Sequence, residues 1–184
     1  MKHDDLRVIK TKQALSRSFF QLLKEKKFSN ITVRNICDFA LVHRTTFYQH
    51  FLDKYDLLFY LINLFTKDYF STNIQKRVNS PFTVMSEVFN KTDELQVIKT
   101  KQDDDREFSR ASTNHFIQLL QKDVLENQQK IVTPPGIPIE LAFYIYESSL
   151  SGFTEWIQSS QTSLKPEKID ELFHKTINIR VKNN

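Results

Sequence analysis

Residues 31–58, ITVRNICDFALVHRTTFYQHFLDKYDLL, decide how the N-terminal part of this chain folds. The pattern predicts a short helix over 33–40 and a second one over roughly 44–50, which leaves only residues 41–43 for the turn between them. Two short helices joined by a tight turn and followed by a longer helix are typical of a helix-turn-helix.

The starts of these helices carry recognisable capping residues. Thr32 is a good N-cap for the first helix, and Ile31 before it can pack on Ile36 as a hydrophobic staple. Asp53 offers a second cap, with Asp56 three residues further on, and it predicts the start of a long third helix.

The second short helix displays side chains that can read DNA. Phe47 and Phe51 lie four residues apart and can anchor it to a core, whereas nearly all its other residues form hydrogen bonds. Arg44 can bond guanine and Gln49 can bond adenine in the major groove. The start of the third helix, with free backbone N–H groups and Lys54 in its first turn, predicts a phosphate clamp.

The same stretch resembles the DNA-binding domain of the TetR family of bacterial regulators, over roughly residues 7–60. The resemblance rests on Thr46-Phe47-Tyr48-Gln49-His50-Phe51, on Lys54-Tyr55-Asp56-Leu57-Leu58, and upstream on Phe28, Ile31-Thr32-Val33, Ile36 and Ala40. Further along, Glu155-Trp156 and Pro166-Glu167 look similar to the dihydroxyacetone-regulator-like branch of that family.

The resemblance implies a homodimeric regulator, a repressor rather than an activator, that binds a palindromic operator in double-stranded DNA. It implies that Thr32, Thr46, Tyr48 and Lys54 hold phosphates with His50 nearby, that Arg44, Thr45 and Gln49 face bases, and that His43 reaches either. It also implies an effector of unknown identity, a small molecule or a protein, that changes the separation of the two reading helices.

Two residues of the turn depart from the family pattern. Leu41 and His43 stand where Gly and Ser are usual. His43 is a poorer N-cap than Ser, and Leu41 raises the cost of any left-handed backbone that Gly adopts easily.

Composition agrees with a soluble helical protein. The chain of 184 residues has 2 Gly and 5 Pro, so few residues interrupt helices. Residues 1–60 hold 11 Lys or Arg against 6 Asp or Glu, a net charge of +5, and the remainder has a net charge of −1. A basic first third predicts an anionic partner. The start predicts no signal peptide, no apolar run is long enough to span a membrane, and a single cysteine fits a cytoplasmic location.

The expected fold class is all-α, with about nine helices and no convincing strand. We expect a helix-turn-helix domain over 1–52 and a helical regulatory and dimerisation domain over 53–184, with a break near 79–81. Later helices are expected at 53–77, 106–130, 138–159 and 166–181, with one or two helices within 82–98, and the charged run 99–107 is expected to be a solvated turn.

The last two expected helices supply the predicted dimer interface. One carries an apolar row beside a row of small residues, which let a second helix approach closely, and the other carries an apolar stripe. The predicted dimerisation residues are Phe143, Tyr146, Ser149, Leu150, Gly152, Phe153, Trp156, Ile169, Leu172, Phe173 and Ile177. Burial of both stripes within one subunit is the alternative.

Two other classes of protein remain open at this point. One is a helical enzyme or metal protein, and the other is an interaction module that uses a degenerate helix-turn-helix as a scaffold. No phosphate-binding loop, catalytic triad or Cys/His cluster is present in the sequence, so we expect no catalytic residue, metal or cofactor.

Overall fold

The computed structural model describes residues 3–89, 93–133, 135–177 and 180–181, and ten α-helices run through these residues. The chain divides into two compact units: unit 1 holds residues 1–65 and 92–116, and unit 2 holds residues 66–91 and 117–184. No helix in the described ranges is both long enough and apolar enough to cross a lipid bilayer. The all-α prediction is confirmed.

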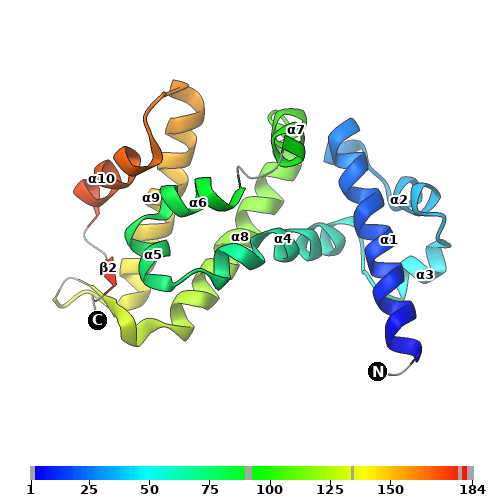
Figure 1. Cartoon of the computed structure of the whole chain (residues 1–184), viewed down its shortest axis with the longest axis horizontal. Helices are drawn as coiled ribbons and strands as arrows, with labels where there is room; N and C mark the ends of the chain where they lie inside the picture. Colours follow the sequence, from blue (N-terminus) through cyan, green and yellow to red (C-terminus); the bar gives the residue numbers. More distant parts are fainter. Residues whose placement is uncertain (1–2, 90–92, 134, 178–179, 182–184) are drawn as a thin grey trace. The chain divides into compact units, whose positions relative to one another are not determined.

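Unit 1 contains the N-terminal helices and a later segment that returns to them (Figure 1). Its elements are α1 (His3–Glu25), the 3₁₀ turn η1 (Phe28–Asn30), α2 (Val33–Ala40), α3 (Arg44–Tyr48), the first part of α4 (Lys54–Ser71), α7 (Asp93–Gln102) and the first part of α8 (Arg106–Glu126). One apolar core joins them, and its fully buried members include Leu15, Phe19, Phe28, Ile36, Phe47, Leu57 and Leu58. The predicted boundary at residue 53 therefore differs from the observed division, because α4 begins inside this core.

The turn between α7 and α8 is held against the end of α1 and against η1. Gln102 is buried, and its amide group donates to the carbonyl oxygens of Leu23 and Lys26, both at 2.7 Å. Its carbonyl oxygen accepts from the Phe28 N–H at 2.8 Å. The prediction of a solvated turn over 99–107 is thus wrong, because α7 runs to Gln102, α8 begins at Arg106, and the Gln102 side chain satisfies three backbone groups of a distant segment.

Asp105 also holds the turn between α7 and α8 against η1. It is buried, and its carboxylate accepts from the backbone N–H groups of Ser29, Glu107 and Phe108 at 2.8, 3.0 and 3.1 Å. Burial opposes ionisation of this carboxyl, but the hydrogen bonds from Ser29 and Phe108 outweigh it and lower its pKa. We call the side chains of Gln102 and Asp105, with their backbone partners, the α7–α8 clasp.

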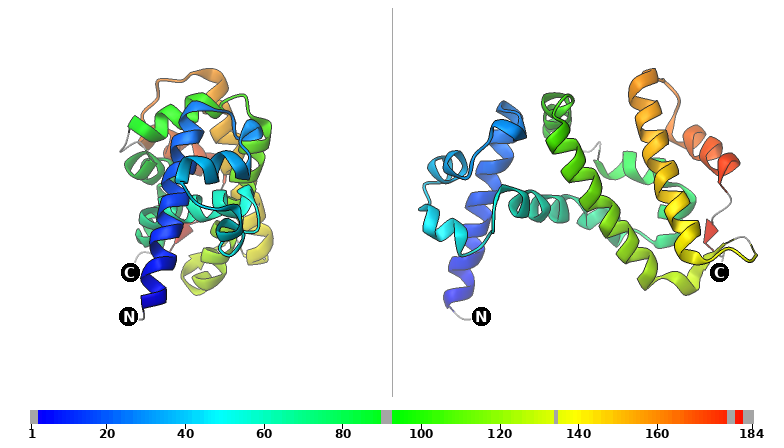
Figure 2. Two further views of the ribbon diagram at one scale, coloured as in Figure 1. Left: turned by 90° about the vertical axis from the view of Figure 1, so that its right-hand side faces the viewer. Right: turned by 180° about the vertical axis from the view of Figure 1, so that it is seen from behind.

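Unit 2 contains the C-terminal helices, which Figure 2 shows from two further directions. Its elements are the end of α4, α5 (Ile74–Asn79), α6 (Pro81–Phe89), the end of α8, the 3₁₀ turn η2 (Gln128–Lys130), β1 (Ile131–Val132), α9 (Ile139–Ser160), α10 (Pro166–Thr176) and β2 (Arg180–Val181). Arg77 and Asp123 form a bidentate ion pair inside it, at 2.5 and 3.0 Å.

Two predicted helix boundaries in unit 2 are wrong, and the predicted break near 79–81 is present. The helix expected over 53–77 ends at Ser71, because Asn73 caps a new helix by accepting from the Gln75 N–H at 2.8 Å. The break near 79–81 separates α5 from α6 within unit 2. The last helix ends at Thr176, because residues 180–181 pair with 131–132 as a short antiparallel sheet.

We expect Gln102→Leu to lower the free energy of unfolding by about 3 kcal/mol, because three buried backbone groups lose their partner. Chemical denaturation followed by circular dichroism measures the change. Gln13→Leu is the matched control, since Gln13 is exposed on α1 of the same unit. Equal stability of the two variants would mean that the clasp contributes nothing to the fold.

Candidate nucleic-acid interface

The first helix of the predicted helix-turn-helix begins as the sequence predicts. The Thr32 hydroxyl accepts from the Asn35 N–H at 3.2 Å, and the Asn35 side chain accepts from the Thr32 N–H at 3.0 Å. Ile31 and Ile36 are both buried in the core of unit 1. The predicted cap at Thr32 is confirmed, and Asn35 completes it as a reciprocal capping box.

The turn between α2 and α3 has the left-handed backbone that its sequence makes costly. Leu41 has φ 54° and ψ 40°, and its side chain is 93% exposed, so no packing offsets the strain. His43 occupies the N-cap position of α3 in an extended conformation, and its side chain makes no capping hydrogen bond. Both departures from the family pattern therefore have the predicted local effect.

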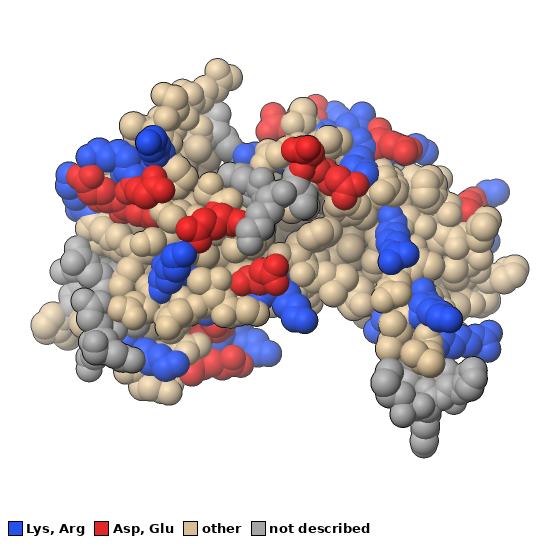
Figure 3. Space-filling view, viewed as in Figure 1, with Lys and Arg blue, Asp and Glu red and all other residues tan. Residues whose placement is uncertain are grey.

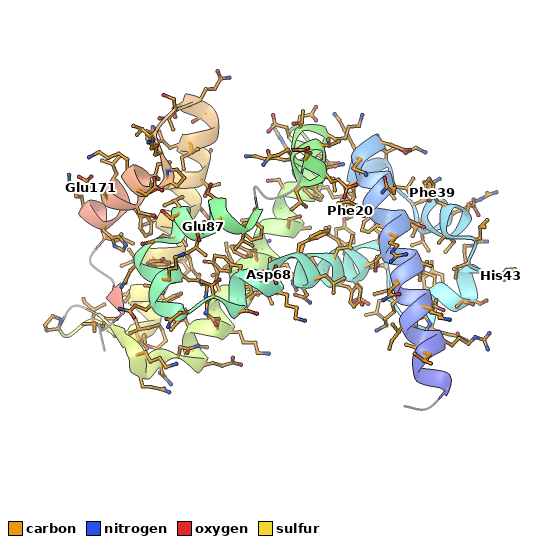
Figure 4. All side chains as sticks on the ribbon, in the orientation of Figure 1. Phe20, Phe39, His43, Asp68, Glu87 and Glu171 are labelled. Atoms are coloured by element: carbon orange, nitrogen blue, oxygen red, sulfur yellow. The ribbon has the colours of Figure 1, made fainter. Side chains whose placement is uncertain are left out.

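One side of α3 is fixed to the core and the other is free. Phe47 and Phe51 are buried with ring centroids 5.7 Å apart, which confirms the predicted anchor. The polar side chains on or beside α3 are exposed or half-buried: His43, Arg44, Thr45, Thr46, Tyr48, Gln49 and His50. Within the described residues none of these side chains forms a hydrogen bond or an ion pair. Figure 4 shows His43 at the outer edge of this region, on the side of α3 away from α1.

The start of α4 is capped more fully than the sequence suggests. The Asp53 carboxylate accepts from the N–H groups of Tyr55 and Asp56 at 2.8 and 2.9 Å. The Asp56 carboxylate accepts from the Leu52 N–H at 3.0 Å. The cap predicted at Asp53 is confirmed, and it already occupies the N–H groups of Tyr55 and Asp56, which the sequence predicts to be free for a phosphate.

The Lys54 ammonium group is engaged within unit 1. It donates to the Phe28 carbonyl oxygen at 3.0 Å, lies 2.8 Å from Glu107 Oε1, and stands 4.3 Å from the centroid of the Phe28 ring. Hydrogen bonds from Lys54 and from the Tyr55 hydroxyl lower the pKa of Glu107. The structure therefore places Lys54 in an ion pair within unit 1. This partner lies on α8, far along the chain, and no local pattern around Lys54 indicates it.

Basic side chains from α1 add to the charge of this region. Arg7, Lys10, Lys12 and Arg17 follow one another along α1 without an intervening acidic residue. Figure 3 shows basic residues and few acidic ones over this part of the helix. The Lys12 ammonium nitrogen lies 5.6 Å from the Phe51 ring centroid, which puts one basic group beside the end of the α3 segment.

Most of the residues predicted to form the dimer interface are core residues of unit 2. Phe143, Tyr146, Leu150, Ile169, Phe173 and Ile177 are buried in the single chain. The ring of Phe173 on α10 lies 5.2 to 5.5 Å from those of Tyr146, Phe153 and Phe82. These side chains are therefore covered within one subunit, where α10 packs on α6 and α9, and their place in a dimer interface stays a prediction.

The opposite side of α9 exposes apolar and small side chains. Leu141, Ile145 and Trp156 are 48%, 46% and 40% exposed, and Gly152 lies among them on the same side. A Cβ atom added to Gly152 would meet no atom of the chain within 4 Å, so packing within the described residues does not require a glycine. Outward-facing residues of α10 are instead charged, as Lys168, Glu171 and Lys175 pair with one another.

Comparison with known proteins finds a partial sequence match and a similar fold among solved structures. No model of a known protein family matches the sequence. The chain is 38% identical over 58 residues to an uncharacterised HTH-type transcriptional regulator, YxbF, of Bacillus subtilis. This match spans 31% of the chain and 15% of that protein.

One solved structure shares the arrangement of helices over nearly the whole chain. A TetR transcriptional regulator from Streptococcus agalactiae superposes with a TM-score of 0.62 and 24% identity, over 95% of this chain and 97% of the other. A TetR family regulator from Marinobacter aquaeolei gives a TM-score of 0.49 and 16% identity, over 97% and 100% of the two chains. The first match shows that the fold is TetR-like.

We expect Leu41→Gly to stabilise the chain by about 1–2 kcal/mol relative to Leu52→Gly, because only Leu41 holds a left-handed backbone. Leu52 is a matched control, since it is also an exposed leucine of the same domain. Equilibrium unfolding in urea compares the two. A lower stability of the Leu41 variant would show that this turn carries no strain.

Proposed function

We propose that this chain is a TetR-family transcriptional repressor, a homodimer that binds a palindromic operator in double-stranded DNA. The observation that carries the proposal is α3: two buried phenylalanines anchor it, and its outward polar side chains have no partner in the described chain. The TetR-like fold and the partial match to an HTH-type regulator support it. A DNA ligand would also place the protein in the cytoplasm, as a regulator and not an enzyme.

The polar groups of the interface divide by reach and chemistry. Arg44, Thr45 and Gln49 are the proposed base readers, because they are exposed on the reading helix and can bond base edges. Other hydroxyl and imidazole groups and the basic residues of α1 are the proposed phosphate ligands: Thr32, His43, Thr46, Tyr48, His50, Arg7, Lys10 and Lys12. We leave Lys54 out of this set because Glu107 and the Phe28 carbonyl already hold it.

We expect selection from random duplexes to return an inverted repeat, with half-sites about one helical turn apart. Arg44→Ala or Gln49→Ala should relax the preference at one base pair and cost about 1–3 kcal/mol there. Arg110→Ala is the matched control, because Arg110 is an exposed arginine on α8 of the same unit. Fluorescence anisotropy with operator variants measures both effects.

Different outcomes would favour the two rival functions. Equal, sequence-independent losses in all three variants would contradict the assigned roles. Absence of DNA binding at moderate salt would favour an interaction module. Stoichiometric bound iron or zinc would favour a metal protein, although no group of three or more potential ligands gathers within the described ranges.

The exposed side of α9 is the proposed dimer interface. Leu141, Ile145 and Trp156 supply apolar area, and Gly152 among them lets the same helix of a second subunit approach closely. A glycine inside a helix costs about 1 kcal/mol relative to alanine. The chain itself leaves open space at Gly152, so packing within one subunit does not require a glycine there. Close approach of a second subunit would explain why a glycine stands at this position.

We expect the double variant Ile145→Glu/Gly152→Leu to be a folded monomer that binds operator weakly. Ile145 is exposed and the space around Gly152 is open, so both substitutions fit the single subunit and its helicity should be unchanged. Thr154→Leu, at an exposed position on another side of α9, should remain a dimer. Analytical ultracentrifugation measures the oligomeric state, and circular dichroism measures the helicity. A persistent dimer in the double variant would place the interface elsewhere.

A further inference from the structure

A cavity of about 280 Å³ lies between the second half of α8 and the first half of α9, entirely within unit 2. Its apolar walls come from Val124 and Leu125 on α8 and from Ile139 and Phe143 on α9. The volume is near the lower limit for ligand sites, which run from about 300 to 1,000 Å³, so the cavity fits a small molecule.

The cavity is also lined by a buried carboxyl group with an unused oxygen. Glu147 is 5% exposed; its Oε2 atom accepts from the Gln121 side chain at 3.0 Å, whereas its Oε1 atom is buried without a hydrogen-bond partner. Burial raises the pKa of this carboxyl, and the Gln121 hydrogen bond opposes that rise only in part. A buried acceptor without a donor is costly. Because Oε1 is closed to solvent where it stands, the Glu147 side chain must turn toward the cavity to accept a hydrogen bond from a ligand, and that bond would offset the cost.

The charge of the lining indicates the sign of the ligand. Glu140 is the second ionisable residue of the lining, and no Lys, Arg or His contributes to it. The rings of Phe143 and Tyr144 also line the cavity, and aromatic faces attract cations. Carboxylates, aromatic faces and an apolar wall together complement a cation that carries an apolar body.

We propose that this cavity binds a lipophilic ammonium ion, whose N–H donates to Glu147 Oε1 while its apolar part packs on Val124, Leu125 and Phe143. This rests on the proposed function in one respect, because the amine would serve as the effector of that regulator. The cavity and the proposed dimer face occupy different sides of α9. The amine would bridge α8 and α9, and α8 is the helix on which Glu107 holds Lys54.

The test uses the full-length protein and three probes of the same shape: 4-phenylbutylamine, 4-phenylbutanol and 4-phenylbutyrate. Isothermal titration calorimetry should show the amine binding about tenfold or more tightly than the alcohol, with no binding of the acid, because the site is anionic. Glu147→Gln should remove this preference for the amine. Leu125→Trp should lower the affinity for the amine, because the larger side chain fills the cavity. Glu126→Gln, outside the lining on α8, is the matched control and should bind like the wild type.

Equal binding of amine and alcohol, an undiminished preference in the Glu147 variant, or no binding of the amine would each overturn the proposal. Thermal unfolding of each variant without ligand verifies that it folds. If the Glu147 variant does not fold, the Leu125 variant still tests the site. Anisotropy with operator DNA is measured on the same samples. Amine binding without operator binding would contradict the proposed function alone, and operator binding without amine binding would contradict this inference alone.

Discussion

The placement of the helix-turn-helix depends on how the chain between α1 and α2 satisfies its buried backbone. This connection turns at η1, and its carbonyl and N–H groups lie against the core of unit 1, where unpaired polar groups are costly. Gln102 and Asp105 supply the missing partners from a segment far along the chain. Phe28 then packs under Lys54 and the ring of Tyr55, and the start of α4 is fixed as well. The α7–α8 clasp is therefore the constraint on which the position of α2 and α3 depends.

That constraint separates the residues that build the reading helix from those left to bind. Apolar side chains at Phe47 and Phe51 and the cap at Thr32 use contacts within the domain. Lys54 belongs to this structural group too, because its charge is neutralised by Glu107 before any DNA arrives. The outward groups of α3 have no such partner, and a polar group that the fold does not use is available for base edges or phosphates. Stability and recognition are thus carried by different residues of one short segment, except at Thr32, which caps α2 and is also a proposed phosphate ligand.

Local signals were sufficient for the parts of the fold that local contacts determine. The caps at Thr32 and Asp53 and the anchor at Phe47 follow from residues within four positions of one another, and all three predictions are confirmed. Partners distant in the sequence were not predictable: an acidic run looks solvated until Asp105 meets the backbone of Ser29. A hydrophobic stripe shows that a helix buries one face but not which helix covers it. The stripe therefore predicts a partner subunit at Phe173, whereas aromatic rings of its own chain surround this residue.

Helix α9 carries two features that the fold of one chain does not explain. A glycine in the middle of a helix disfavours helix formation, yet the space around Gly152 is open and gives no internal reason for it. A buried carboxylate oxygen without a donor disfavours folding, yet Glu147 lines a cavity that apolar residues could fill. When most residues of a sequence favour its fold, the few that destabilise it are typically found at functional sites. They lie on different sides of the same helix, so one points to a second subunit and the other to a ligand. A helix that serves both is well suited to link occupation of the cavity to the geometry of the dimer.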